Sequence, residues 1–428
     1  KGRFCADPAS DFYHQYPVDL KLCHDFGING IRISIAWTRI FPDGVGKINQ
    51  EGVEYYHRVF QECRKQGVEP FVTLHHFDTP ESFYKEGDFL NKKTIDAFVE
   101  YAKFCFEEYK DEVTYWFTFN EIWAVATNTY IEGTFPYGVQ YDLGNAILLM
   151  HNMMVAHAKV VIAYKEANYH GKIGIVHSLE TKYPYNESKE EDKQAAKNED
   201  VLNNQILLDA TFLGDYSEET MKVIQNLVEL NHSTFEPKAE DMAVLKKASQ
   251  LNDYLGINYY QSRFIQAYDG ENDIFHNGTG EKGTSRFRLK GVGERVEKEG
   301  IPRTDWDWLI YPEGMYDMIM RIKNDYPNYK EIYITENGMG YKDDFVDGEI
   351  DDTPRIDYIK GHLQWLLRAA NEGACVKGYF VWSLMDMFSW TNGYNKRYGL
   401  FYVDYETQKR YPKKSAYWFK EITQTKEV

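Results

Sequence analysis

The chain has 428 residues, enough to bury a large core in one α/β barrel with insertions or in two or three domains. Its formal net charge of −17 disfavours non-specific binding to nucleic acid and to anionic membranes. An anionic ligand would therefore need a local basic pocket.

Strand and helix patterns alternate along the chain. Short apolar runs predict strands at Gly30–Trp37, Glu69–His76, Val113–Phe119, Lys172–His177, Asp253–Tyr259, Glu331–Thr335 and Val376–Trp382. Longer periodic patterns predict helices at Asp19–Phe26 (as the end of a helix), Gly52–Gln66, Lys92–Tyr109, Gly144–Ala167, Lys189–Leu213, Pro237–Ser249, Gly314–Asn324, Asp357–Asn371 and Lys413–Glu421. The charged, turn-rich segment at about 265–305 reads as an insertion.

This alternation, without a break in composition, predicts one α/β domain over residues 1–428 with a parallel sheet. Polar and aromatic residues follow the predicted strands at their carboxyl ends, where a (β/α)8 barrel builds its active site: His76, Asn120, Glu121, Asn258, Glu336 and Trp382. A doubly wound open sheet is the alternative, but neither GxGxxG nor a P-loop occurs. We predict a (β/α)8 TIM barrel, although we find seven strands and nothing before Asp19 resembles the first.

Two of these residues, Glu121 and Glu336, are acids that end buried strands. Burying a carboxylate is costly unless it is paired, so each is either functional or satisfied by a nearby Arg for structure alone. Two carboxylates across a barrel mouth suit glycoside hydrolysis, and retaining enzymes hold them about 5–5.5 Å apart. Aromatic residues make up 16% of the chain, and carbohydrate clefts use such rings as platforms, although Tyr-rich surfaces also occur without a ligand.

Six motifs, from about Asp11 to the end of the chain, resemble family 1 glycoside hydrolases in family order. They are RISIAWTRIFPDG (Arg32–Gly44), VTLHHFDTP (Val72–Pro80), FTFNE (Phe117–Glu121), LGINYY (Leu255–Tyr260), YITENG (Tyr333–Gly338) and GYFVWSLMDMFSW (Gly378–Trp390). The resemblance implies a double displacement with Glu336 as nucleophile and Glu121 as acid/base. Arg32 would pair with Glu336 and keep it ionised.

The resemblance also implies sugar-binding residues. His76, Asn120, Asn258 and Tyr260 would contact the sugar or orient the two acids, and Trp382 would form a platform. The alternatives are ordinary polar residues that close strand ends and a core Trp. The chemistry needs no cofactor. Adjacent strand residues point to opposite faces, so His75 and His76 do not suggest a metal site.

The segment Met387–Tyr402 resembles the branch of the family that acts on 6-phosphorylated glycosides. Ser389 stands where enzymes for neutral sugars carry an acid, and Lys396 and Tyr398 follow at the spacing of the phosphate signature. A surface Lys-Arg pair is the alternative for Lys396. Trp390 resembles the residue of enzymes that take galactosides. We therefore expect hydrolysis of 6-phospho-β-D-galactosides such as lactose 6-phosphate, with activity on the gluco epimer as the alternative.

One family feature is absent. Members open with a strand that carries a Tyr-Gln-x-Glu-Gly motif, whose Gln binds sugar hydroxyls, and no such segment occurs here. This leaves a catalytically impaired sugar-phosphate-binding fragment as an alternative, and a plain β-galactosidase or β-glucosidase as another.

The five cysteines form no CxxC motif, which predicts reduced thiols and no zinc site. We find no apolar run that approaches the ~18–20 residues of a membrane span, and the opening KGRFCADPASD does not resemble a signal peptide. We therefore expect a cytoplasmic protein, and the sequence does not indicate its oligomeric state.

Overall fold

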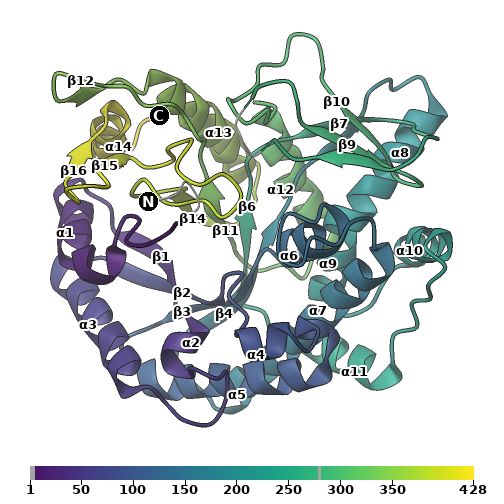
Figure 1. Cartoon of the computed structure of the whole chain (residues 1–428), viewed down its shortest axis with the longest axis horizontal. Helices are drawn as coiled ribbons and strands as arrows, with labels where there is room; N and C mark the ends of the chain where they lie inside the picture. The colour runs from purple at the N-terminus through teal and green to yellow at the C-terminus, as the bar shows by residue number, and fades with distance from the viewer. Residues whose placement is uncertain (1–4, 278–280) are drawn as a thin grey trace.

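A computed structural model describes residues 5–277 and 281–428. Seven strands form one parallel sheet that curls around a central axis, with helices outside it (Figure 1). In sheet order they are β1 (Gly30–Ser34), β2 (Glu69–His75), β3 (Tyr115–Asn120), β4 (Lys172–Ser178), β6 (Tyr254–Asn258), β11 (Ile332–Asn337) and β14 (Val376–Val381). All seven predicted strands are confirmed, and the chain has the parallel α/β barrel architecture that the alternation predicted.

The described residues do not close the barrel. Strands β1 and β14 end the sheet, and no strand pairing joins them within residues 5–277 and 281–428. A cavity of about 720 Å³ lies along this seam, and its lining includes Gly30, Phe71, Tyr333 and Phe380. The expectation of seven strands therefore holds for the part of the chain that the structure describes.

Except for α10, the long helices agree with the predicted ones, with differences at their ends. They are α1 (Phe12–Asp25), α3 (Gln50–Gln66), α5 (Lys92–Tyr109), α7 (Leu143–Glu166), α8 (Glu190–Asp200), α9 (Ile206–Phe212), α10 (Glu218–Leu230), α11 (Ala239–Ala248), α12 (Glu313–Asp325), α13 (Thr353–Asn371) and α14 (Lys414–Thr425). The predicted helix Lys189–Leu213 is α8 and α9, joined by a π-helical turn (Val201–Gln205). The prediction missed α10, whose first turn is capped by Ser217.

Short helices fill several loops that follow strands. They are α2 (Trp37–Ile40), α4 (Glu81–Tyr84), α6 (Ile122–Ala126) and the π-helical segment η2 (Thr127–Ile131). The predicted strand Gly30–Trp37 was too long, because β1 ends at Ser34 and Trp37 begins α2 with its indole buried against Tyr101. These loops form part of the rim at the carboxyl ends of the strands.

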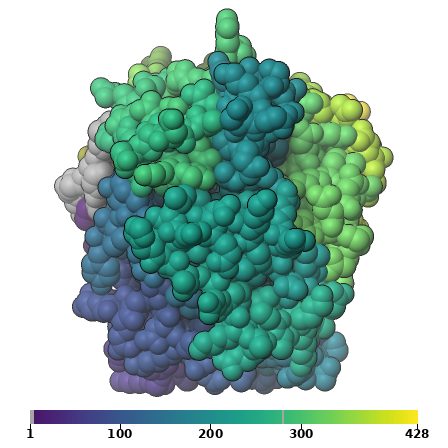
Figure 2. All heavy atoms as spheres, turned by 90° about the vertical axis from the view of Figure 1, so that its right-hand side faces the viewer, coloured from purple at the N-terminus to yellow at the C-terminus, as the bar shows by residue number. Residues whose placement is uncertain are grey.

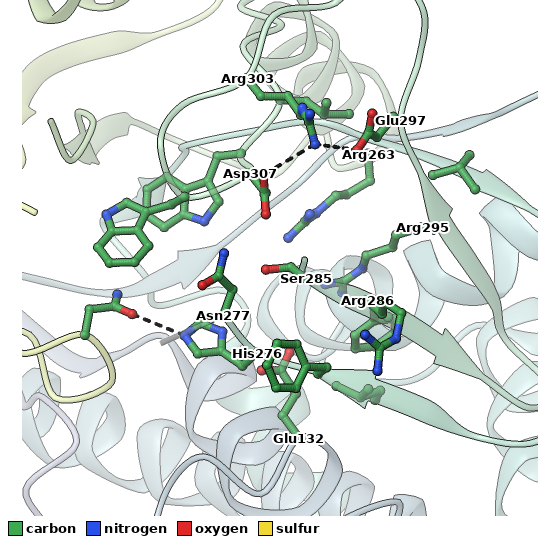
Figure 3. A pocket seen from close by; sticks show the side chains of 18 residues that line it. Glu132, Arg263, His276, Asn277, Ser285, Arg286, Arg295, Glu297, Arg303 and Asp307 are labelled. Carbon is green, nitrogen blue, oxygen red and sulfur yellow. Dashed lines mark hydrogen bonds and ion pairs between the residues drawn. The ribbon is translucent and has the colours of Figure 1, made fainter. Parts of the chain in front are cut away.

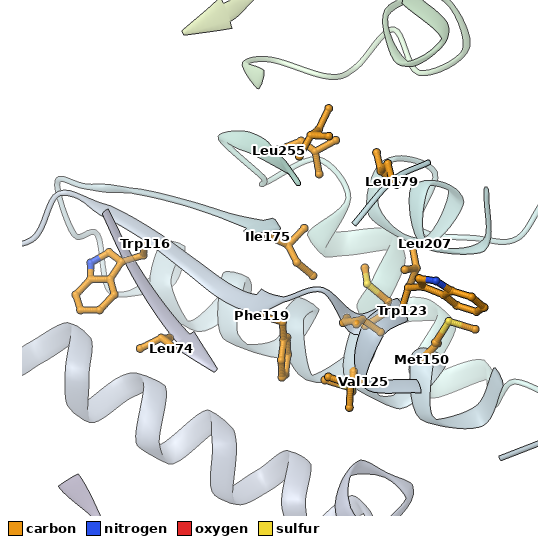
Figure 4. Packing of buried hydrophobic residues seen from close by; sticks show 14 of the residues in the cluster. Leu74, Trp116, Phe119, Trp123, Val125, Met150, Ile175, Leu179, Leu207 and Leu255 are labelled. Atoms are coloured by element: carbon orange, nitrogen blue, oxygen red, sulfur yellow. The ribbon is translucent and has the colours of Figure 1, made fainter. Parts of the chain in front are cut away.

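Helix α7 is the apolar helix of the core. Its 24 residues are enough to span a membrane, and an 18-residue window within it has a mean hydropathy of 1.6, which is apolar enough for such a span. However, 78% of that window is buried within the structure. The expectation that no apolar run approaches a membrane span was therefore wrong for α7. It contacts α5, α9 and α11, and Figure 4 shows Met150 of α7 near Trp123 and Val125 of α6. Such burial identifies a core helix of a globular domain.

A second sheet stands beside the barrel mouth, at the upper right of Figure 1. Its order is β5 (Lys182–Pro184), β7 (Arg263–Gln266), β10 (Gly293–Val296), β9 (Arg286–Leu289) and β8 (Asp273–Phe275), antiparallel except between β5 and β7. The segment at about 265–305, expected as an insertion, supplies most of these strands, and its residues 278–280 lie outside the described part. The face shown in Figure 2 is formed largely by the middle of the chain, coloured teal to green, which includes α8 to α11.

Two hairpins complete the fold: β12 (Phe345–Val346) with β13 (Glu349–Ile350), and β15 (Phe401–Val403) with β16 (Arg410–Pro412). The second lies beside α1, so the two ends of the described chain meet (Figure 1).

Candidate active site

A cavity of about 420 Å³ opens at the carboxyl ends of the parallel strands. Most of the site residues predicted from the sequence line it: His76, Asn120, Glu121, Tyr260, Glu336, Trp382, Ser389, Trp390 and Tyr398. Arg32 and Asn258 lie behind this lining and contact it through hydrogen bonds, whereas Lys396 does not line it. The barrel thus brings together residues that are far apart in the sequence.

Glu336, on β11, is held at both carboxylate oxygens. Arg32 donates to Oε1 and the Tyr260 hydroxyl donates to Oε2. Arg32 is itself fixed by Thr73 Oγ1 at 2.8 Å and Asn120 Oδ1 at 3.1 Å. The structure thus contains the expected ion pair between Arg32 and Glu336. Burial raises the pKa of Glu336, and Arg32 and Tyr260 oppose that rise.

Glu121 follows β3 directly and has the left-handed backbone φ of 53°. Asn258 donates to its Oε1 at 2.7 Å. Burial raises the pKa of Glu121 to about 8, and the Glu336 carboxylate adds to the rise, against the opposing effects of Asn258 and Arg32. Glu121 is therefore protonated at neutral pH and can donate a proton.

An amide network connects the two acids. Asn258 Nδ2 donates to Asn120 Oδ1 at 3.0 Å, and its own Oδ1 accepts from Thr335 Oγ1 at 2.7 Å. Asn120 Nδ2 lies 3.2 Å from His76 Nε2. Burial, and then the Arg32 charge, hold the pKa of His76 well below its usual value, so the neutral ring accepts from Asn120. The network fixes the orientation of Glu121 relative to Arg32.

The segment that carries Ser389 is folded back on itself. Ser389 and Gly393 exchange two backbone hydrogen bonds of 3.0 and 2.7 Å, and Trp390, 52% exposed, contacts Phe135 at the cavity mouth. Tyr398 is buried against the cavity. Trp382 forms another wall and stacks on the His76 ring with centroids 6.0 Å apart.

Lys396 does not line the cavity in this structure. Its Nζ lies 3.7 Å from Asp305 Oδ2 and 5.2 Å from the Trp306 ring, and its side chain is 16% exposed. This side chain is thus too enclosed for an ordinary surface lysine.

A cluster of buried charges supports the segment that carries Ser389. Asp386 accepts from Arg397 Nη1 and from Lys413 Nζ, each at 2.6 Å, and Lys413 also donates to Asp343 at 2.6 Å. Burial alone would raise the pKa of Asp386, but Lys413 and Arg397 outweigh it and lower the value. Removing one partner of such a cluster leaves a buried charge, so the cluster keeps the segment in one conformation.

Sequence reasoning missed other residues of the cavity, among them Glu180 and Trp308. Glu180 follows β4 by two residues and is half-buried, with its side chain 16% exposed. The nearby Arg263 and Lys182 charges lower its pKa, although burial alone would raise it. Its position at a strand end was the same signal that identified Glu121. Trp308, whose ring centroid lies 5.0 Å from that of Tyr260, comes from a long loop and follows no strand.

A parallel α/β barrel with two glutamates at the carboxyl ends of its strands, facing one cavity, has the architecture of a glycoside hydrolase. Residues 1–428 match the profile of Glycosyl hydrolase family 1, and the chain belongs to that family.

Two relatives in sequence have the same name. A 6-phospho-beta-galactosidase from Leptotrichia buccalis is 59% identical over 425 residues, which span 99% of this chain and 91% of the relative. A 6-phospho-beta-galactosidase from Staphylococcus aureus is 58% identical over 427 residues, again 99% and 91% of the two chains.

Solved structures support the fold. The family 1 β-glucosidase from Thermotoga maritima superposes with a TM-score of 0.87 at 34% identity, covering 98% of this chain and 88% of that one. The β-glucosidase from the same organism in complex with glucoimidazole gives a TM-score of 0.86 at 34% identity, with the same coverage.

Proposed function

We propose that this chain hydrolyses 6-phospho-β-D-galactosides, such as lactose 6-phosphate, with retention at the anomeric carbon. The observation that carries the proposal is the cavity that holds Glu121 and Glu336 together with Ser389 and Tyr398, and no acid stands at position 389. Family membership and the relatives named 6-phospho-beta-galactosidase support it.

In this mechanism Glu336 attacks the anomeric carbon while Glu121 gives its proton to the leaving oxygen. The glycosyl–enzyme ester is then hydrolysed by a water molecule that Glu121, now ionised, deprotonates. Arg32 and Tyr260 stabilise the carboxylate of Glu336 when it is released, and Asn258 orients Glu121. The raised pKa of Glu121 keeps it protonated for the first step.

The phosphate on O6 would meet Ser389 and Tyr398, with Lys396 turning from Asp305 to join them. A carboxylate at position 389 would oppose the phosphate by about 4 kcal/mol for unit charges ~4 Å apart at an effective dielectric of 20. Trp390 would lie near O4, whose orientation distinguishes galactose from glucose.

A phosphorylated disaccharide substrate implies a cytoplasmic enzyme of lactose catabolism. A sugar phosphotransferase system would supply the phosphorylated substrate. The five cysteines are free, which suits a reducing compartment.

The test is hydrolysis of nitrophenyl β-galactoside with and without a 6-phosphate, beside the gluco pair. We expect the highest kcat/KM for the phosphorylated galactoside. Preference for a neutral sugar would contradict the assignment of Ser389, Lys396 and Tyr398 to the phosphate. Preference for the phosphorylated gluco epimer would contradict the proposed role of Trp390 in selecting galactosides. Absence of activity on all four would favour a sugar-phosphate-binding protein.

Lys396→Ala tests the phosphate contact. Loss of one charge-assisted hydrogen bond of about 1.5–3 kcal/mol should raise KM for phosphorylated substrate about 10- to 150-fold. Activity on neutral galactoside should not change. Lys409→Ala removes an exposed lysine from the β15–β16 turn and is the matched control. An equal effect of Lys396→Ala on both substrates would contradict the assignment.

A further inference from the structure

A second cavity, of about 140 Å³, adjoins the catalytic one between the second sheet and the loop 303–309 (Figure 3). The residues that line both cavities are Glu132, Arg263, His276, Arg295, Trp308 and Asn392. A cavity of roughly 150 Å³ accommodates a six-membered ring such as benzene. A ligand that reaches from the catalytic cavity can therefore place one ring here.

Asp307 supplies an unused acceptor to this second cavity. Thr304 closes the turn that carries it, since its N–H donates to Trp308 O at 2.9 Å and its Oγ1 accepts from the Trp308 N–H at 3.3 Å. Asp307 Oδ1 accepts from the Gly283 N–H at 2.6 Å and from Arg303 Nη1 at 3.3 Å, whereas Oδ2 is buried without a hydrogen-bond partner among the described residues. A buried acceptor without a partner is unfavourable, so a ligand donor would be favourable there.

Arg263 supplies donors from the opposite wall. Its Nε donates to Glu180 Oε2 at 3.1 Å, and its terminal nitrogens make no hydrogen bond within the described part of the chain. Figure 3 shows the Arg263 guanidinium and the Asp307 carboxylate pointing toward one another across the cavity. They form no ion pair with each other in residues 5–277 and 281–428, so the space between them is open to a ligand.

This cavity lies on the acid/base side of the reaction. Glu180, the partner of Arg263, lines the catalytic cavity together with Glu121. In a retaining glycosidase the acid/base protonates the leaving-group oxygen, so the leaving group departs on this side. Trp308, near Tyr260, forms the wall between the two cavities.

The chemistry of the lining suits a neutral sugar. Its other arginines are already paired with acids: Arg286 with Asp273 at 2.9 Å, Arg295 with Glu199 at 2.6 Å, and Arg303 with Glu297 and Asp307. No surplus of positive charge therefore attracts an anion. Sugar hydroxyls both donate and accept, which satisfies a carboxylate and a guanidinium together. Trp308 offers an apolar face to a pyranose ring.

Resting on the proposed function, we infer that the cavity between Arg263 and Asp307 binds the neutral leaving sugar of a 6-phosphorylated disaccharide. Asp307 Oδ2 accepts from one of its hydroxyls, and the terminal nitrogens of Arg263 donate to another. The enzyme thus selects a sugar, rather than an aromatic or alkyl group, on the leaving side.

Asp307→Asn tests this inference. Asn tolerates the φ of 63° at this position and keeps an oxygen that can accept from Gly283 and Arg303, but it replaces the free acceptor by a donor. We expect kcat/KM for lactose 6-phosphate to fall about 10- to 100-fold. The value for nitrophenyl 6-phospho-β-galactoside, whose ring lacks those hydroxyls, should stay within about twofold and also reports correct folding. Glu299→Gln removes one exposed acid nearby and is the control.

Equal losses on both substrates, or no loss on lactose 6-phosphate, would overturn the inference. Calorimetric binding to Glu336→Gln separates it from the proposed function. Lactose 6-phosphate should bind more tightly than galactose 6-phosphate, and the added Asp307→Asn change should remove the difference. Equal affinities before that change would overturn only the leaving-sugar site. If neither ligand bound, the proposed function would fail, and the inference with it.

Discussion

Glu336 and Glu121 lie at the ends of different strands, and their partners prepare them for opposite tasks. Glu336 receives hydrogen bonds at both oxygens, one of them from a permanently charged guanidinium, which stabilises the ionised form. Glu121 receives one hydrogen bond, from an uncharged amide, and the negative charge of Glu336 favours its protonated form. Two carboxyl groups in one cavity thus differ because their surroundings differ.

Glu336→Gln should abolish turnover. The amide preserves the shape of the side chain but is not a nucleophile, so kcat should fall on the order of 10⁴-fold or more. Binding of the phosphorylated substrate should persist, because Lys396, Ser389 and Tyr398 are untouched. Steady-state kinetics together with calorimetry would measure both. Retained turnover would contradict the assignment of Glu336 as the nucleophile.

The pH profile should report Glu121. Because the acid must be protonated to donate, kcat/KM should fall as pH rises through about 8, where burial and Glu336 hold its pKa. The measurement is kcat/KM of nitrophenyl 6-phospho-β-galactoside between pH 5 and 10. Glu121→Gln should show residual activity without that alkaline limb. If the alkaline decrease in kcat/KM persisted in this variant, the titrating group would be a residue other than Glu121.

Sequence reasoning identified site residues that lie at strand ends and belong to motifs. Asn120, Glu121, Asn258 and Glu336 have both properties, whereas Arg32 lies within β1 and was identified by its motif alone. The structure brings all five into one network. It did not foresee that Lys396 contacts Asp305, because the rotamer of a long side chain depends on neighbours from another loop. Residues on long loops, such as Asp307, carry no periodic signal at all.

At the level of secondary structure, α1 is joined to the C-terminal hairpin through one buried ion pair. Arg410 of β16 donates from Nε to Asp19 Oδ1 at 2.8 Å, and the two side chains are 2% and 1% exposed. Burial raises the pKa of Asp19 and Arg410 opposes the rise. The pair therefore fastens the first helix to the end of the chain.

Arg410→Leu should destabilise the protein by about 3–5 kcal/mol, because it leaves the Asp19 carboxylate buried without its cation. At ~2.1 cal/mol/K per residue this corresponds to roughly 1 °C of Tm per kcal/mol. Calorimetry of Arg410→Leu, Asp19→Asn and the double variant would measure the coupling. We expect the double variant to be more stable than Arg410→Leu alone, and the opposite order would contradict the pairing.

The parallel strands were predictable because each is an apolar run that ends at a polar residue or a breaker. The second sheet was not, since its strands are short and charged: β9 is Arg286–Leu289 and β10 is Gly293–Val296. Here Arg288 pairs with Glu294 across the two strands at 2.6 Å, so the charges stabilise the sheet by pairing rather than by burial. From the sequence alone, such a charged segment is interpreted as an insertion and not as strands.

For the molecule as a whole, we propose that residues 1–428 form one domain with an insertion at about 265–305. The open edge of its main sheet lies between β1 and β14. Backbone groups on the outer sides of these strands lack strand partners among the described residues, whereas β3, β4 and β6 are paired on both sides.

Stability should therefore vary around the barrel. Amide hydrogens of β1 and β14 should exchange at least about tenfold faster than those of β3, β4 and β6, because local opening costs less at an open edge. Hydrogen exchange followed by mass spectrometry would measure this. Equal protection of all seven strands would show that the seam is sealed in solution.

The core position of α7 has a consequence for synthesis on the ribosome. The helix ends at Glu166, but α9 and α11, which cover it, extend to Ala248. A nascent chain of intermediate length thus carries an uncovered segment as apolar as a membrane anchor. During that interval the unfinished chain is exposed to aggregation and to capture by holdase chaperones, and the danger ends only when the helices that follow have emerged.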